Sequence, residues 1–296
     1  MTELLRALAA FAEEPGTGHE QLARSLQLPG TPDAAAFTEV FVFNLYPYAS
    51  VYLGAEGQLG GEARDRVAGF FRAVGAVPPP EPDHLATLLV AYAQLGTDAD
   101  ADEAGPRGHA ARTLLHEHLL PWLPLYLARI TELASAPYAE WGLLLGRVLL
   151  SEACRFGEPP RLPLHLRAAP PPDLRTDDLD GFVDTLLAPA RSGMVLTGSD
   201  LVRAARDLRL GLRIGERRFV LRALLSQQPP ATLEWLAAHT VTTSRAWCSW
   251  AAALPGTAAW WTGRAEHTNV QLRELAKEAG AQPHDHTREP IVVPRP

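Results

Sequence analysis

Lysine and cysteine are almost absent from this chain of 296 residues. Lysine occurs once, at Lys277, and the remaining members of the 27 Lys and Arg are all arginines. The two cysteines, Cys154 and Cys248, form no CxxC pair, so no disulfide framework is expected. Free thiols of this kind are typical of a protein that works in a reducing cytosol.

Targeting patterns and long apolar runs are also missing. No apolar run reaches the roughly 20 residues that a membrane-spanning helix needs. Residues Met1 to Arg6 do not form the basic segment and unbroken apolar core of a secretory signal. We therefore expect a cytoplasmic protein without membrane insertion.

Positive charge is in short supply. The chain has 34 acidic side chains against 27 Lys and Arg, which gives a net charge of -7 at pH 7. A general nucleic-acid-binding protein needs a basic surface. We therefore expect no nucleic-acid partner.

Catalytic signatures are absent as well. The sequence contains no G-x-S-x-G elbow, GxGxxG motif or P-loop. His116 and His118 suggest a metal site, but side chains at i and i+2 of an α-helix point about 200° apart and cannot share an ion. We expect one of these histidines to be packed and the other exposed. No catalytic residue, metal or cofactor is assigned, and the chain is predicted not to be an enzyme.

Apolar residues at helical spacing dominate what is present. One helix is marked by apolar residues at i, i+3, i+4 and i+7, namely Val67, Phe70, Phe71 and Val74, and Gly75 suits the position after its end. An earlier apolar and aromatic stripe from Phe37 to Tyr52 contains Pro47, which predicts a break near Phe43. Runs rich in Val, Ile and Thr are rare. These patterns predict an all-α bundle.

Proline divides the chain. Residues 157–175 are dense in proline and lack periodicity, which is typical of a linker. We predict a helical domain over 1–156, this linker, and a helical C-terminal region over 176–281. Its helices are expected near 177–188, 199–209, 215–226, 230–238 and 257–279. The tail over 282–296 is polar and proline-rich, and we predict that it is disordered.

Two proline-marked segments join polar side chains to an apolar helix start. The first is Pro82-Asp83-His84-Leu85. The second begins at His116-Glu117-His118, is interrupted at residues 121–124, and ends at Tyr126. Aspartate is a preferred N-cap, which stabilises a helix by about 1 kcal/mol, so we expect Asp83 to cap the helix that follows it. The combination favours a protein that holds another chain over one that transforms a small molecule.

A helix-turn-helix near 199–225 is the alternative. Leu201, Ala205 and Leu208 would face inward on the first helix, with Gly211 in the turn. Arginines that could face phosphates follow, and they are Arg213, Arg217, Arg218 and Arg222. The net acidity of the chain argues against this DNA-binding regulator.

The two proline-marked segments resemble motifs of the TorD/DmsD family of maturation chaperones, to which the NarJ-type chaperones are related. That family carries a Pro-Asp-His element ahead of a helix, matched at residues 82–84. It also carries a His-Leu-x-x-Trp-x-x-x-aromatic element, matched from His118 through Trp122 to Tyr126. The resemblance covers roughly residues 33–155.

The resemblance implies an all-helical chaperone and a defined partner. Such proteins bind the twin-arginine signal peptide and the apo-form of a molybdopterin-dependent oxidoreductase, assist cofactor insertion and prevent premature export. A monomer or a homodimer is compatible with this role. An apolar groove would hold the apolar part of the signal, and carboxylates would pair with its arginines. The expected groove residues are Tyr48, Tyr52, Trp122 and Tyr126, and the expected polar residues are Asp83, His84, Glu117 and His118.

Overall fold

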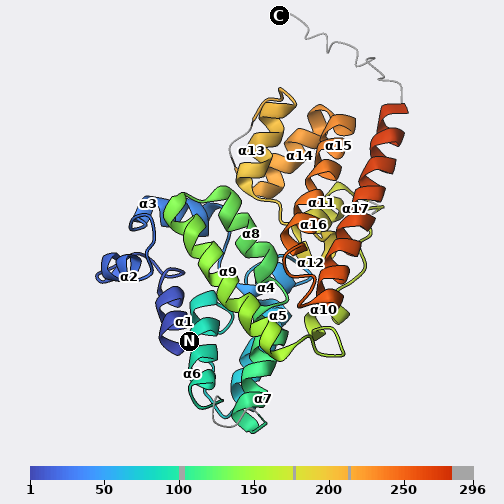
Figure 1. Ribbon diagram of the computed structural model, residues 1–296. Helices are drawn as coiled ribbons and strands as arrows, with labels where there is room; N and C mark the ends of the chain where they lie inside the picture. The colour runs from blue at the N-terminus through green and yellow to red at the C-terminus, as the bar shows by residue number, and fades with distance from the viewer. Residues whose placement is uncertain (100–103, 176–177, 213–214, 282–296) are drawn as a thin grey trace, which may run out of the picture.

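The computed structural model describes residues 1–99, 104–175, 178–212 and 215–281, and this part of the chain contains helices and no strand (Figure 1). The prediction of an all-α protein is therefore confirmed. The predicted disorder of 282–296 and the predicted role of Arg213 lie outside the described residues. The α-helices are α1 (Thr2–Ala10), α2 (His19–Ser25), α3 (Ala34–Phe37), α4 (Ala49–Leu53), α5 (Gly61–Ala73), α6 (Leu85–Ala99), α7 (Pro106–Thr113), α8 (Leu123–Leu133), α9 (Ala136–Phe156), α10 (Leu164–Ala168), α11 (Leu179–Leu187), α12 (Pro189–Ser192), α13 (Gly198–Asp207), α14 (Arg217–Gln227), α15 (Pro229–His239), α16 (Val241–Trp247) and α17 (Pro255–Ala281).

Two π-helical segments, η1 (Thr38–Asn44) and η2 (Leu114–Leu119), precede the proline interruptions. The chain leaves η1 after Asn44 and re-enters a helix only at Ala49, so the break predicted from Pro47 is present. The interruption predicted at residues 121–124 is also present, because α8 begins anew at Leu123 with a proline in its first turn. Gly75 has a φ of +80°, as expected for a residue that ends a helix.

Apolar side chains form two cores, and the first core takes side chains from both the N-terminal and the C-terminal part of the chain. The first core gathers helices α1 to α9 and is completed by Trp247, Trp250 and Trp261 from the far end of the sequence. The second core gathers α11, α13, α14, α15 and the last turns of α17. Helix α17 therefore spans both cores, and Figure 1 shows it running along one side of the molecule. The predicted division into domains stays a prediction, but apolar packing joins the two regions.

The proline-rich segment over 157–175 is packed against the helices. It contains the short helix α10, and the side chains of His165, Leu166 and Leu174 are buried. The carboxylate of Glu158 accepts hydrogen bonds from the backbone N–H of Gly256 at 2.7 Å and of Thr257 at 2.7 Å. A carboxylate in this position satisfies free N–H groups at the start of α17 and interacts favourably with the helix dipole. The segment thus ties the two regions together.

Gly193 marks a close approach of backbones and gives a first testable prediction. Its φ is +74°, and an added Cβ atom would lie 2.5 Å from the backbone N of Ala265 in α17. Gly193→Ala should therefore lower the free energy of unfolding by about 2–4 kcal/mol, from backbone strain and from the clash with α17. Urea denaturation followed by tryptophan fluorescence measures the loss.

Gly75→Ala is the matched control for this prediction. Gly75 follows the end of α5 with a φ of +80°, close to that of Gly193, but an added Cβ atom would meet nothing within 4 Å. This variant should therefore lose only about 1 kcal/mol through backbone strain. Equal losses in the two variants would show that the contact with Ala265 contributes nothing.

Candidate functional site

The segment from Pro82 to Leu85 pairs with residues 47–49, which lie at the start of α4. The backbone N–H of Ala49 donates to the carbonyl of Asp83 at 3.0 Å, and the N–H of Leu85 donates to the carbonyl of Pro47 at 2.8 Å. Tyr48 and His84 face each other as an isolated antiparallel bridge. Two segments that lie more than thirty residues apart are thereby fixed side by side.

Asp83 caps a helix, but it is not the helix that follows it. The carboxylate of Asp83 accepts a hydrogen bond from the backbone N–H of Ser50 at 3.1 Å, in the first turn of α4. At the start of α6, Nδ1 of His84 accepts from the N–H of Ala86 at 3.3 Å. The expectation that Asp83 caps α6 is therefore wrong. The physical reason is that α4 has no side-chain cap of its own, and the pairing brings the carboxylate to its free N–H groups.

Carboxylates surround the imidazole of His84, and we call Glu13, Glu81 and Asp83 the acidic corner. Nδ1 of His84 lies 3.5 Å from Oε1 of Glu13, whose side chain is exposed. Burial lowers the pKa of His84, while the three carboxylates oppose this shift. A neutral imidazole fits its role as hydrogen-bond acceptor from Ala86, and it leaves the negative charge of Glu13 unbalanced.

Tyr48 forms the aromatic wall of the acidic corner. Its ring meets the ring of His84 edge-on, with centroids 4.8 Å apart. Burial and a hydrogen bond with Glu81 raise the pKa of Tyr48 to about 12. Tyr48 is half-buried, so part of this side chain faces solvent beside Glu81.

An apolar groove adjoins the acidic corner. It lies between α1 and α6, has a volume of about 460 Å³, and includes Glu13 at its rim. Its apolar lining comes from Ala9, Ala10, Phe71, Ala86, Val90 and Ala91. We call this the α1–α6 groove. Arg6 also lines the groove, but its charge is balanced by Glu3 at 3.0 Å, whereas the charge of Glu13 is not balanced. An unbalanced carboxylate beside an apolar channel is suited to a peptide that has a basic part followed by an apolar part.

The other three aromatic site residues form a buried cluster. The ring of Tyr52 stacks on Trp122 with centroids 5.0 Å apart, and Tyr126 meets both rings. Trp122 donates from its indole N–H to the carbonyl of His118 at 2.9 Å, and Tyr52 donates to the carbonyl of Tyr46 at 3.0 Å. All three lie in the first core and line no surface in this structure. Their contact with a peptide stays a prediction that requires α4 to move.

The predicted polar residues Glu117 and His118 face the proline-rich segment. Glu117 accepts a hydrogen bond from the backbone N–H of Leu164 at 2.7 Å, at the start of α10. The ring of His118 packs against Phe70 and against His165, with centroids 5.5 Å away in each case. Burial lowers the pKa of His118 to about 4. These two residues hold the linker, and the structure does not bring them to the acidic corner.

His116 and His118 are both buried, so the expectation of one packed and one exposed histidine is wrong. The segment over 157–175 packs beside η2 and covers side chains that a bare helix would leave open. Among the described residues, no three His, Cys, Asp or Glu side chains gather as metal ligands. In the same part of the chain, no helix combines the length and apolar character of a membrane span.

The predicted hairpin over 199–225 is present as α13 and α14, but its arginines are engaged within the chain. Arg218 and Arg222 pair with carboxylates of α11, with Nη1 of Arg222 at 2.5 Å from Oδ1 of Asp180. Arg217 donates to the carbonyl of Leu196 at 2.8 Å. These contacts favour a role in holding the second core together over contact with phosphates.

Sequence reasoning missed the groove and two of the three acidic partners of His84, namely Glu13 and Glu81. Glu13 lies about seventy residues before His84, and no spacing connects them. The only local signal is the position of Glu13 and Glu14 just after α1, next to a proline. The groove forms only where α1 packs on α6, and the sequence of either helix by itself does not predict it.

Comparison with known proteins gives consistent matches to the N-terminal part of the chain. Residues 3–128 match the family described as nitrate reductase delta subunit. The chain is 37% identical over 82 residues to the selenate reductase assembly chaperone protein of Thauera selenatis, covering 26% of this chain and 42% of that protein. It is 36% identical over 85 residues to the chlorate reductase assembly chaperone protein of Ideonella dechloratans, covering 27% of this chain and 44% of that protein. The alignments thus span less than half the length of either relative.

Proposed function

Because residues 3–128 match the nitrate reductase delta subunit family, we propose that this chain is an assembly chaperone for a molybdopterin-dependent reductase. The two relatives are named as assembly chaperones of selenate reductase and of chlorate reductase. We further propose that it binds the twin-arginine signal peptide and the apo-form of its client in the cytoplasm. In this role it assists cofactor insertion and prevents premature export, and it catalyses no reaction itself.

The observation that carries the proposal is the junction of the acidic corner and the α1–α6 groove. The exposed carboxylates of Glu13 and Glu81 can pair with arginines of the signal in charge-assisted hydrogen bonds. The groove that starts at Glu13 can hold the apolar part that follows. All of its lining residues lie within the range matched by the family.

The buried site residues Asp83, Tyr52 and Trp122 hold the acidic corner in place. Asp83 caps α4, and α4 carries Tyr52 onto Trp122, so the corner and the aromatic cluster are connected through one short helix. Tyr48 and His84 form the wall and floor of the corner. Rigid positioning of this kind reduces the conformational entropy that the chaperone loses on binding.

Capture of the client tests the proposed role. The full chain, immobilised and exposed to a native lysate of its source in which the reductase is expressed, should retain the molybdopterin-binding subunit, identified by mass spectrometry. Its signal peptide is then synthesised with a fluorescent label, and binding is followed by anisotropy. Recovery of no molybdoenzyme subunit under these conditions contradicts the proposed function.

Neutralising the exposed carboxylates tests the proposed site. Glu13→Gln with Glu81→Gln should weaken binding of that signal peptide by about fivefold, because each exposed ion pair contributes roughly 0.5 kcal/mol. The effect should shrink at high salt, where exposed charges are screened. Glutamines preserve the shape of the corner, so the circular dichroism spectrum should not change.

The matched control for this test is Glu234→Gln with Glu266→Gln. Both residues are exposed and lie on α15 and α17, so the variant carries the same change in net charge away from the groove. It should bind the signal peptide as the parent does. An equal loss in both variants would point to net charge, and no loss in the first would remove the acidic corner from the binding site.

A further inference from the structure

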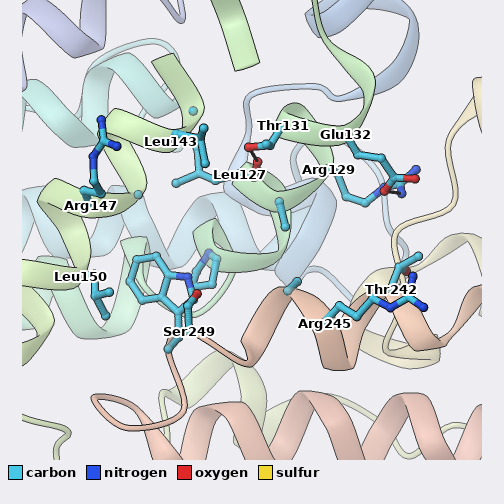
Figure 2. A pocket seen from close by; sticks show the side chains of 16 residues that line it. Leu127, Arg129, Thr131, Glu132, Leu143, Arg147, Leu150, Thr242, Arg245 and Ser249 are labelled. Carbon is cyan, nitrogen blue, oxygen red and sulfur yellow. Dashed lines mark hydrogen bonds and ion pairs between the residues drawn. The ribbon is translucent and has the colours of Figure 1, made fainter. Parts of the chain in front are cut away.

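A second pocket lies where the C-terminal region packs on α8 and α9 (Figure 2). Its volume is about 470 Å³, and α16 closes it on one side. The apolar lining includes Leu127 of α8, Leu143 and Leu150 of α9, and Trp250, which follows α16. Helices α9 and α16 both lie outside the residues matched by the family, so this pocket depends on the part of the chain that the match does not cover.

The charges around this pocket do not cancel. Arg129 and Arg203 are balanced by Asp200 and Glu132, since each arginine pairs with both carboxylates. Arg147 of α9 and Arg245 of α16 are exposed and form no ion pair within the described part of the chain. They stand on opposite sides of the pocket (Figure 2). The lining therefore offers apolar surface with two uncompensated positive charges.

We propose that this pocket binds an acidic amphipathic segment of a partner protein. Apolar side chains of that segment would pack on Leu127, Leu150 and Trp250, and its carboxylates would pair with Arg147 and Arg245. Leu143 of the lining is 42% exposed, so the apolar surface of the pocket reaches solvent, which favours a peptide over a small enclosed ligand. A basic signal peptide is excluded by the same charges, so the proposal goes beyond the function proposed above.

Selection from a peptide library tests this inference without knowledge of the partner. A phage-displayed library of random 15-residue peptides is selected on the immobilised full chain. The enriched pool should be rich in peptides that combine at least two carboxylates with apolar residues. The best peptide, synthesised with a fluorescent label, should bind the parent chain and lose affinity as salt is raised.

Charge reversal assigns the binding to the pocket. Arg147→Glu with Arg245→Glu should weaken the acidic peptide at least tenfold, because like charges across an interface repel. The same variant should prefer the peptide in which lysines replace the glutamates. Arg72→Glu with Arg273→Glu changes the net charge equally on two exposed arginines outside the pocket, and it should bind within twofold of the parent.

Three outcomes would overturn the inference. One is an enriched pool without acidic apolar sequences, and another is a peptide that binds equally well to the Arg147→Glu/Arg245→Glu variant. The third is dodecanoate binding with the same dependence on the two arginines while no acidic peptide is enriched, which assigns the pocket to small anionic amphiphiles. Binding of the cationic signal peptide should be unchanged in this variant, so failure of this inference is distinguishable from failure of the proposed function.

Discussion

Asp200→Asn should lower the free energy of unfolding by about 3–5 kcal/mol, because it leaves the guanidinium of Arg129 buried without its main counter-charge. Nη2 of Arg129 donates to both carboxylate oxygens of Asp200, at 2.6 and 2.7 Å. Both side chains are almost fully buried. Although burial opposes ionisation of the carboxyl, Arg129, His239 and Thr197 together lower the pKa of Asp200. Urea denaturation followed by tryptophan fluorescence measures the loss.

A double variant separates the buried charge from the lost contact. Arg129→Met with Asp200→Asn removes both charges and leaves an amide oxygen that can still accept from the backbone N–H of Thr197 in the capping box, so it should recover much of the stability that Asp200→Asn alone loses. Arg203 and Glu132 remain exposed enough to be solvated in the double variant. A loss below about 1 kcal/mol in Asp200→Asn would show that the ion pair does not hold α8 to α13.

Acidification from pH 7 to pH 5 should lower the free energy of unfolding by about 2 kcal/mol for each of three buried histidines, about 6 kcal/mol in all. Burial lowers the pKa of His116 and of His118 to about 4, and that of His165 to about 3. The unfolded chain binds protons at these positions near pH 6.5, whereas the folded chain does not. Stability is therefore complete above pH 6.5 and falls as the pH is lowered toward the folded-state pKa values.

Substitution identifies the histidines that cause the acid sensitivity. His118→Gln removes one titrating group, so its loss of stability between pH 7 and pH 5 should be smaller than that of the parent by about 2 kcal/mol. His165→Gln, at the ring that meets His118, should reduce the loss by a similar amount. Denaturation curves at pH 7, 6 and 5 give these slopes. Identical slopes in the parent and in His118→Gln would show that this imidazole titrates normally in the folded protein.

Those parts of the fold were predictable that depend on residues close together in the sequence. Apolar spacing located α5, and Pro47 located the break between η1 and α4. The five helices predicted after residue 175 are present as α11, α13, α14, α15 and α17, whereas α12 and α16 were not predicted. These two are short, and α16 is held chiefly by packing of Trp247 in the first core, which a periodic pattern within seven residues does not reveal.

The site was predictable only in part, because its capping contacts are not local. Asp83, Glu117 and Glu158 each accept backbone N–H groups of a helix distant in sequence, which are α4, α10 and α17. Capping rules assume that the cap precedes its helix directly, and so they assigned Asp83 to α6. The burial of His116 and His118 was missed for a related reason, since the segment that covers them begins some forty residues later.

The first core cannot be completed until the C-terminal region of the chain has been synthesised. Trp247 and Trp261 are fully buried in that core, yet they follow α9 by roughly ninety residues or more. At a synthesis rate of about 5–20 residues per second, helices α1 to α9 wait on the order of 5–20 s for these side chains. During that interval, their apolar contact surface on α8 and α9 is open to the solvent. An incomplete chain at this stage is therefore more prone to aggregation than the finished protein.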